Sequence, residues 1–241
     1  MSVYYQDDKV TLYHGDCLVE HREWLDANVL ITDPPYGTQF TKANPRGGYG
    51  RRKKGAPDGF TVAGDKDTTT RDSVLTMWGE RAAAIFGSPR MPEPPGTWTE
   101  RLIWDKVEPG MNGGPFRYTH ENIYLRDDDP YTHENIFLRG DGWREKGRDK
   151  FSILRFPRSD GMGNEERSEH AHRKPVGLME ALIEAYPEGT IADPFAGSGS
   201  TLVAAKLLGR QVIGVEIEEK HCEVIARRLS QGVLDLFGGA A

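Results

Sequence analysis

Residues 190–217 read TIADPFAGSGSTLVAAKLLGRQVIGVEI, and this stretch decides the fold. TIAD (190–193) is a short apolar segment that ends in an acid. LVAAKLL (202–208) has helix-forming composition and is closed by Gly209, while QVIGVEI (211–217) is rich in β-branched residues. The order strand, glycine turn, helix, strand predicts a βαβ unit and therefore a parallel sheet.

The same alternation continues on both sides of this stretch. Helices are predicted at 179–186 and 220–229, strands at 9–14, 29–33 and 101–105, and a helix running into a strand at 73–86. We therefore expect an α/β fold with a mostly parallel twisted sheet flanked by helices, in one domain that spans residues 1–241.

A duplicated segment interrupts this pattern. YTHENIYLR at 118–126 recurs as YTHENIFLR at 131–139, with Asp-Asp-Asp-Pro between the two copies. Two strands joined by a four-residue turn predict an antiparallel hairpin. We expect one copy in the sheet and the other displaced, and the role of the duplication stays open.

Composition indicates a globular, intracellular protein. Of the 241 residues, 37% are hydrophobic and 28% are charged, and no apolar run is long enough to cross a membrane. The polar start does not resemble a signal peptide, so a cytoplasmic location is expected. Cys17 and Cys222 are far apart and are expected to be reduced thiols.

Basic residues are clustered, although the net charge of −6 argues weakly against a nucleic-acid partner. A loop predicted at 38–66 carries six basic side chains and no acid between residues 41 and 55: Lys42, Arg46, Arg51, Arg52, Lys53 and Lys54. These residues are candidates for phosphate contacts. A second basic region lies within 140–171, which we interpret as a short target-recognition segment.

The glycine turn predicts a nucleoside site. Gly197 and Gly199 permit a tight turn and a close approach of the backbone to a ligand. A P-loop is excluded because Ser200 stands where its lysine would be, and the dinucleotide fingerprint lacks its third glycine. Glu216, at the end of the next strand, is an acceptor for ribose hydroxyls. The pattern therefore favours a nucleoside without a pyrophosphate.

A second strand end carries an unusual motif. VLIT is followed by Asp33, Pro34, Pro35 and Tyr36. A carboxylate beside a rigid carbonyl offers two acceptors, which complement the two donors of an NH2 group, and the aromatic ring offers a stacking face for a flat base. For this role, Asp33 must not be engaged in an internal ion pair.

Together, TDPPYG (32–37) and DPFAGSGST (193–201) resemble the motifs of the amino-group DNA methyltransferases that use S-adenosylmethionine. The order of the two motifs is similar to that of the permuted β subgroup. HGDC (14–17), HRKPVGLMEALI (172–183) and GVEIEEKHCEVIARRL (214–229) resemble further cofactor segments of this family, and either HENI copy resembles a late strand. The resemblance implies a Rossmann-like methyltransferase fold.

The resemblance also implies roles for the site residues. Asp33 and the Pro34 carbonyl accept the amino group of a flipped base, and Tyr36 stacks on it. Asp16 would contact the cofactor's adenine, Glu216 its ribose, Lys174 its carboxylate and Asp193 its amine. The remaining cofactor-binding candidates are Phe195, Gly197, Ser198, Gly199 and Thr201.

The implied activity is methylation of double-stranded DNA by a monomer or homodimer of bacterial or phage origin, at adenine N6 because of Asp33. No metal is expected, since His14, His170 and His172 lack zinc-like spacing. Three alternatives stay open: cytosine-N4 methylation, methylation of an RNA or protein amide, and non-catalytic nucleic-acid binding. Neither the target sequence nor a restriction partner can be read from the chain.

Overall fold

The strands of residues 190–217 and those near the N-terminus form one sheet in the computed structural model, which describes residues 3–37, 63–106, 120–126, 153–157 and 173–231. The strands are β1 (Val3–Gln6), β2 (Val10–His14), β3 (Val29–Thr32), β4 (Ala83–Gly87), β5 (Glu100–Asp105), β6 (His120–Arg126), β7 (Ile153–Arg155), β8 (Ile191–Asp193) and β9 (Val212–Glu216). The helices are α1 (Thr69–Trp78), α5 (Val176–Ile183), α6 (Ser200–Leu207), α7 (Glu219–Gln231) and the short 3-10 helix η1 (Arg22–Asp26).

The strand order is β1-β2-β9-β8-β3-β4-β6-β5-β7. The five strands from β2 to β4 are mutually parallel, so their carboxyl ends share one edge of the sheet. Strand β1 pairs antiparallel with β2, and β6 runs antiparallel between β4 and β5. This arrangement confirms the predicted α/β class with a mostly parallel sheet, and its antiparallel hairpin is formed by β1 and β2.

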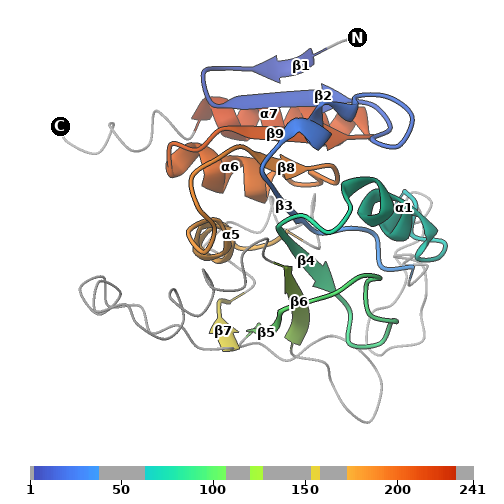
Figure 1. The fold of residues 1–241 in the computed structure, drawn as a ribbon. Coiled ribbons are helices and arrows are strands. Elements are labelled where there is room, and N and C mark those ends of the chain that lie inside the picture. Colours follow the sequence, from blue (N-terminus) through green and yellow to red (C-terminus); the bar gives the residue numbers. More distant parts are fainter. Residues whose placement is uncertain (1–2, 38–62, 107–119, 127–152, 158–172, 232–241) are drawn as a thin grey trace, which may run out of the picture.

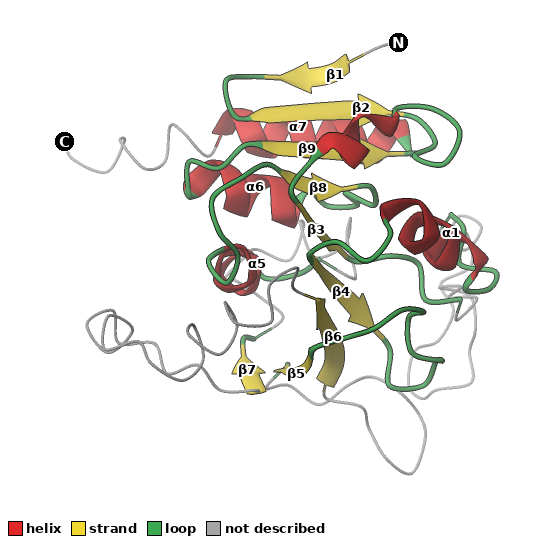
Figure 2. Ribbon diagram, in the orientation of Figure 1, coloured by secondary structure: helices red, strands yellow, loops and turns green. Residues whose placement is uncertain are grey.

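Both faces of the sheet are covered by helices (Figures 1 and 2). Val29 and Ile31 of β3 belong to the apolar cluster that includes residues of α5, α6 and α7, whereas Leu30 belongs to the cluster with η1 and α1. Because successive side chains of a strand point to opposite faces, one short strand supplies both layers. All four residues of β3 are buried, which is typical of a central parallel strand.

Two predicted element boundaries differ from the structure. The segment 73–86 is not a helix running directly into a strand, since α1 begins at Thr69 and ends at Trp78, before β4. Gly79 ends this helix with a φ of 75° and donates its backbone N–H to Leu75. Helix α5 begins earlier than expected, directly after Pro175, and ends at Ile183.

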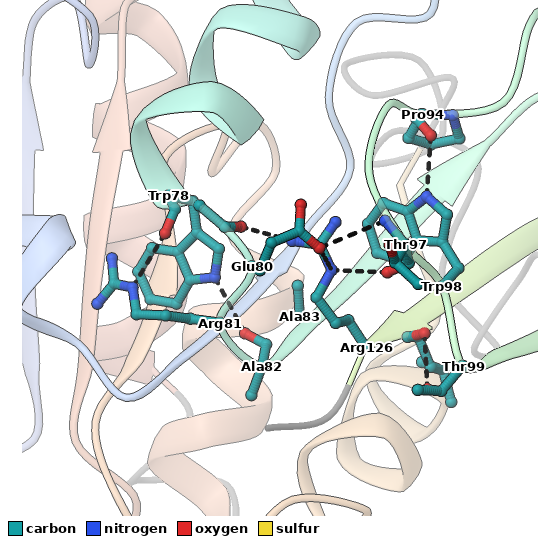
Figure 3. A network of polar contacts seen from close by, with 12 residues as sticks. Trp78, Glu80, Arg81, Ala82, Ala83, Pro94, Thr97, Trp98, Thr99 and Arg126 are labelled. Atoms are coloured by element: carbon teal, nitrogen blue, oxygen red, sulfur yellow. Dashed lines mark hydrogen bonds and ion pairs between the residues drawn. The ribbon is translucent and has the colours of Figure 1, made fainter. Parts of the chain in front are cut away.

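Residues 120–126 of the first copy of the duplicated segment form β6. Arg126, its last residue, is 3% exposed and pairs with Glu80 at 3.4 Å. Its Nε donates to the Thr97 carbonyl at 2.8 Å, and its guanidinium lies 4.5 Å from the centre of the Trp98 ring (Figure 3). These contacts fix the register of β6. The second copy lies outside the described residues, as does the predicted hairpin between the copies.

The two candidate DNA-contacting segments are only partly described. All six basic residues predicted to contact phosphates lie outside the described residues, as does most of 140–171. Within the latter segment, residues 153–155 form β7, which pairs in parallel with β5 at one end of the sheet. In the described part of the chain, no helix is long and apolar enough to span a membrane.

Candidate active site

The two motifs meet at the carboxyl edge of the parallel strands. Strands β3 and β8 are neighbours, and the hydroxyl of Thr32 donates a 2.6 Å hydrogen bond to Oδ1 of Asp193. A cavity of about 410 Å³ opens at this edge. Its lining includes Asp33–Tyr36 from the first motif and Asp193–Ser198 from the second. Ligands of open parallel sheets bind at such edges, so this cavity is the candidate active site.

The structure brings nearly all described candidates together. Asp16, Asp33, Pro34, Pro35, Tyr36, Lys174, Asp193, Phe195, Gly197, Ser198, Thr201 and Glu216 all line the cavity. Gly199 is the candidate that does not line it. A Cβ at this position would lie 2.8 Å from Ile225, and φ is 76°, so glycine is required there by packing and by backbone conformation.

The glycine turn is held by the strand that follows it. Gly197, with a φ of 52°, donates its N–H to Oε2 of Glu216 at 2.7 Å. Oε1 of the same carboxylate accepts the N–H of Glu218 at 2.8 Å. Glu216 is 7% exposed and still lines the cavity. The carboxylate is therefore fixed by two backbone donors, with acceptor capacity left for a ligand.

Asp16 reaches the cavity from the end of β2. The N–H of Gly15 donates to the carbonyl of Glu216 at 3.0 Å, which continues the β2–β9 pairing beyond the strands. Oδ1 of Asp16 accepts the N–H of Leu18 at 2.8 Å. This bond orients the Asp16 carboxylate at the rim of the same site as Glu216.

Asp193 is buried at the centre of the site, with 2% of its surface exposed. Burial raises its pKa from 3.8 to about 6, although hydrogen bonds from Thr201, Thr32 and the Phe195 N–H partly oppose this shift. An acid with such a pKa is poised to respond to a cationic ligand, because a nearby positive charge favours the ionised form.

Asp33 is engaged within the protein, contrary to the requirement drawn from the sequence. Its Oδ2 pairs with the ammonium of Lys174, and its Oδ1 accepts the hydroxyl of Tyr36 at 2.5 Å. A carboxylate has about four lone-pair sites, so these two bonds leave acceptor capacity. The Asp33 side chain is 28% exposed and lines the cavity, and it therefore remains accessible to a ligand.

The Lys174 ammonium pairs with carboxylates of the protein itself, and the contact with the cofactor carboxylate that the resemblance implies stays a prediction. The side chain is buried, and its ammonium contacts Asp33 and lies 3.4 Å from Glu121. Its backbone carbonyl accepts the Ser200 hydroxyl at 2.7 Å, which joins the start of α5 to the start of α6. The two carboxylates raise the pKa of Lys174 against the opposing effect of burial.

Glu121 and Asp65 are site residues that sequence reasoning missed. Glu121, on β6, lines the cavity and accepts the Tyr36 hydroxyl at 3.1 Å. Its signal was the HENI segment, but the duplication gave no reason to choose one copy. Asp65 also lines the cavity and accepts the N–H of Gly37 at 2.7 Å. No local motif marks Asp65, because its contact joins residues that are 28 positions apart in sequence.

Metal binding finds no support in the described residues. Among them, no group of three or more histidine, cysteine, aspartate or glutamate side chains is arranged to hold a metal ion. Cys17 and Cys222 are both buried thiols, and burial raises the pKa of each to about 12, with smaller effects of nearby acids.

Parts of this chain resemble proteins of known sequence. The profile of the N6_N4_Mtase family, described as DNA methylase, matches residues 93–227, which is more than half of the chain. A putative methylase, YubD, of Escherichia coli strain K12 is 42% identical over 74 residues, covering 30% of this chain and 33% of that protein. The type II methyltransferase M.ScaI of Streptomyces caespitosus is 31% identical over 96 residues, covering 38% and 32%. The matched segments thus span about a third of the length of these relatives.

Two solved structures share the fold over nearly the whole chain. The M1.HpyAVI–SAM complex superposes with a TM-score of 0.60 at 19% identity, covering 91% of this chain and 98% of that one. The cytosine-N4-specific PvuII DNA methyltransferase has a TM-score of 0.61 at 15% identity, covering 94% and 88%. At these identities the likeness concerns the fold.

Proposed function

Because this chain belongs to the DNA methylase family of N6 and N4 amino-methyltransferases, we propose that it transfers a methyl group from S-adenosylmethionine to the exocyclic amino group of a base in double-stranded DNA. One observation carries the proposal: Asp33 and Tyr36 line the same cavity as Gly197 and Glu216. An amine acceptor site and a nucleoside site therefore share one space.

The described residues fit S-adenosylmethionine by their chemistry. Asp193, Glu216 and Asp16 are acceptors that complement an ammonium group, ribose hydroxyls and an adenine amino group, respectively. At Gly197 a Cβ would meet nothing closer than 3.7 Å, so the missing side chain leaves room for a ligand against the backbone. M1.HpyAVI, which shares the fold, was solved as a complex with the same cofactor. When bound, the cofactor supplies a methyl group activated by a sulfonium centre.

The protein's own groups act on the base. Its exocyclic nitrogen is a poor nucleophile, because the lone pair is conjugated with the ring. Asp33 and the Pro34 carbonyl accept its two N–H groups, which favours a pyramidal nitrogen with a localised lone pair. Tyr36 holds the ring from one face. The Asp33 carboxylate, which lines the cavity, is also the base to which we assign the proton that the nitrogen releases on alkylation. Positioning and electrostatic complementarity supply the catalysis.

Adenine N6 is the proposed target, on the basis of aspartate at the first motif position. Cytosine N4 is the second candidate, since it presents a similar conjugated amine and the PvuII enzyme, which shares the fold, is cytosine-N4-specific. The DNA backbone would be held by the basic residues of the 38–66 loop, which are Lys42, Arg46, Arg51, Arg52, Lys53 and Lys54. A relatively small recognition segment, 140–171, is available for the target sequence.

The test is transfer of tritiated methyl groups from S-adenosylmethionine to DNA that lacks N6-methyladenine and N4-methylcytosine. An RNA control is run in parallel, and nucleosides are analysed by mass spectrometry. We expect N6-methyladenine in DNA. N4-methylcytosine would assign the second candidate, transfer to RNA alone would assign the RNA alternative, and no transfer to any substrate would refute the proposal.

Asp33→Ala is the matched variant for the catalytic motif. We expect transfer to be abolished while the dissociation constant for S-adenosylmethionine, measured by calorimetry, stays largely unchanged. Asp33→Asn serves as a control that keeps the shape of the side chain while removing its charge. Methylation at the wild-type rate by the Asp33→Ala protein would show that this carboxylate has no part in the reaction.

A further inference from the structure

Glu121 lies at the centre of a polar network that extends beyond the two motifs. Its Oε1 pairs with the ammonium of Lys106, while its Oε2 accepts the Tyr36 hydroxyl at 3.1 Å and lies 3.4 Å from Nζ of Lys174. The side chain is 14% exposed and lines the cavity. Each group of the network comes from a different part of the chain, so only the folded sheet brings them together.

The network keeps Glu121 ionised. Burial by itself would raise its pKa, but the ammonium groups of Lys174 and Lys106 outweigh burial and lower the pKa to about 2. A carboxylate with two cationic partners and one hydroxyl donor is well satisfied, which matters because an unpaired charge at this depth would be strongly destabilising.

The first consequence concerns the tyrosine of the motif. The hydroxyl of Tyr36 lies 2.5 Å from Oδ1 of Asp33 and 3.1 Å from Oε2 of Glu121. Burial, together with both carboxylates, raises the pKa of Tyr36 well above 10, so the hydroxyl retains its proton. Two acceptors on one hydroxyl fix the direction of the phenol ring, and thereby the face that it offers to a base.

The second consequence concerns the lysine. The groups that face the Lys174 ammonium are Asp33 and Tyr36 after β3, Glu121 on β6, and the rings of Phe86 on β4 and Trp104 on β5, at 5.0 and 5.8 Å. Only two of these groups are anionic. Without Glu121, the buried ammonium would depend on Asp33 alone for charge compensation and would compete more strongly for its lone pairs.

The register of β6 places Glu121 at this point of the sheet. Glu121 stands opposite Trp104 of β5, and the same strand ends at the buried Arg126, which is held by Glu80, Thr97 and Trp98 (Figure 3). The second copy of the segment carries Glu134 in the same local sequence. The described strand uses the first copy.

We propose that Glu121 is a positioning residue of the active site, which holds Tyr36 and Lys174 so that the Asp33 carboxylate is directed at the amino group of the base. This inference rests on the proposed function. It assigns to the first HENI copy a role in the reaction step that involves the base, without direct contact with the cofactor.

The test compares Glu121→Gln with Glu134→Gln, which removes the equivalent charge from the second copy. Methyl transfer to DNA is measured under steady-state conditions, and binding of S-adenosylmethionine by calorimetry. For Glu121→Gln we expect kcat to fall about 10- to 100-fold, while the dissociation constant of the cofactor stays within about twofold. For Glu134→Gln we expect wild-type values of both.

The pH profile separates positioning from a general loss of structure. Lys174 holds the Asp33 carboxylate in place only while it is an ammonium. Loss of one of its two carboxylate partners lowers the pKa of Lys174, so kcat of Glu121→Gln should decline at a lower alkaline pH than kcat of the wild type. A merely structural defect would not shift the pH at which kcat declines. If Glu121→Gln does not fold, Glu121→Asp retains the charge one methylene further back, and it should fold and still show reduced kcat with unchanged cofactor binding.

Other results of these measurements would overturn either the positioning role of Glu121 or the proposed function. Equal activity of Glu121→Gln and wild type would overturn the positioning role. A loss of activity seen only when Glu121→Gln and Glu134→Gln are combined would also overturn it, since either copy would then suffice. Parallel loss of cofactor binding and kcat would also overturn it. If the wild-type protein transfers no methyl group to DNA, the proposed function fails, and this inference fails with it.

Discussion

The Thr32 hydroxyl donates a 2.6 Å hydrogen bond to Asp193, and it thereby joins the residue before Asp33–Tyr36 to the first residue of the glycine turn. Both side chains are buried, at 1% and 2% exposure, on the neighbouring parallel strands β3 and β8. The two motifs are thus coupled at their bases, beneath the cavity that their following residues line.

Thr32→Val should weaken this coupling with little change of volume. The variant leaves one buried acceptor of Asp193 without its donor, which costs about 1–3 kcal/mol. We expect a lower free energy of unfolding in urea. We also expect a further rise in the pKa of Asp193, because the Thr32 hydrogen bond stabilises the ionised carboxylate in the wild type. Thr32→Ser, which keeps the hydroxyl, is the control. If Val and Ser behave alike, the hydrogen bond has no measurable effect.

Asp193 should make stability and cofactor binding depend on pH in opposite directions. Its pKa is raised from 3.8 to about 6 in the folded protein, so its stabilising contribution is complete below about pH 4 and is lost as pH rises through 6. The unfolding free energy of the wild type, relative to Asp193→Asn, should therefore fall across this interval and then level off.

An ammonium ligand favours the ionised carboxylate, so the affinity for S-adenosylmethionine should rise over the same pH interval. Calorimetric titrations between about pH 5 and 8 measure this effect, and Asp193→Asn should show a smaller pH dependence. A wild-type affinity that does not change across this range would contradict a contact between Asp193 and the cofactor amine.

Gly197 and Gly199 should fail in different ways when substituted. At Gly199 a Cβ would lie 2.8 Å from Ile225 at a φ of 76°, so Gly199→Ala should lower the free energy of unfolding by about 1–3 kcal/mol. At Gly197 the space is open, and aspartate tolerates left-handed backbone. Gly197→Asp should therefore fold but lose cofactor binding, because its side chain enters the cavity.

Thermal unfolding and calorimetry of both variants separate the two effects. Equal losses of stability in the two proteins would show that Gly197 is also a packing residue. Cofactor affinity retained by Gly197→Asp would exclude the turn from the binding site.

Asp7 should hold the hairpin of β1 and β2 in place by its contact with helix α6. It accepts the N–H groups of Lys9 and Val10 and pairs with Lys206 of α6 at 2.6 Å. Although burial opposes the effect, these bonds lower the pKa of Asp7 to about 2. The stabilisation is therefore present above about pH 4 and is lost as pH falls towards 2.

Asp7→Asn should reduce the free energy of unfolding at pH 7 by about 1–3 kcal/mol, and the difference from wild type should shrink in acid. The adjacent Asp8 is exposed, so Asp8→Asn is the matched control and should be nearly neutral. A similar effect of both substitutions would mean that general charge, and not the pairing with Lys206, accounts for the change.

Local patterns determined the elements and much of the candidate site. The βαβ order of 190–217 follows from hydrophobic periodicity and from glycines that stop a helix, which depend on residues close in sequence. The two motifs were recognisable for the same reason, since each is a short run at the end of a strand. Their joint lining of one cavity then follows from the parallel sheet.

Only the tertiary structure decided which charges meet. Lys174 lies 141 residues from Asp33 in sequence, and the pair forms because the residues just before α5 and just after β3 line the same cavity. Glu121 meets Tyr36, Lys106 and Lys174 because β6 pairs with β4 and β5, which two nearly identical segments cannot reveal. Which distant charged side chains meet depends on the order of the strands in the sheet, and no short stretch of sequence contains that order.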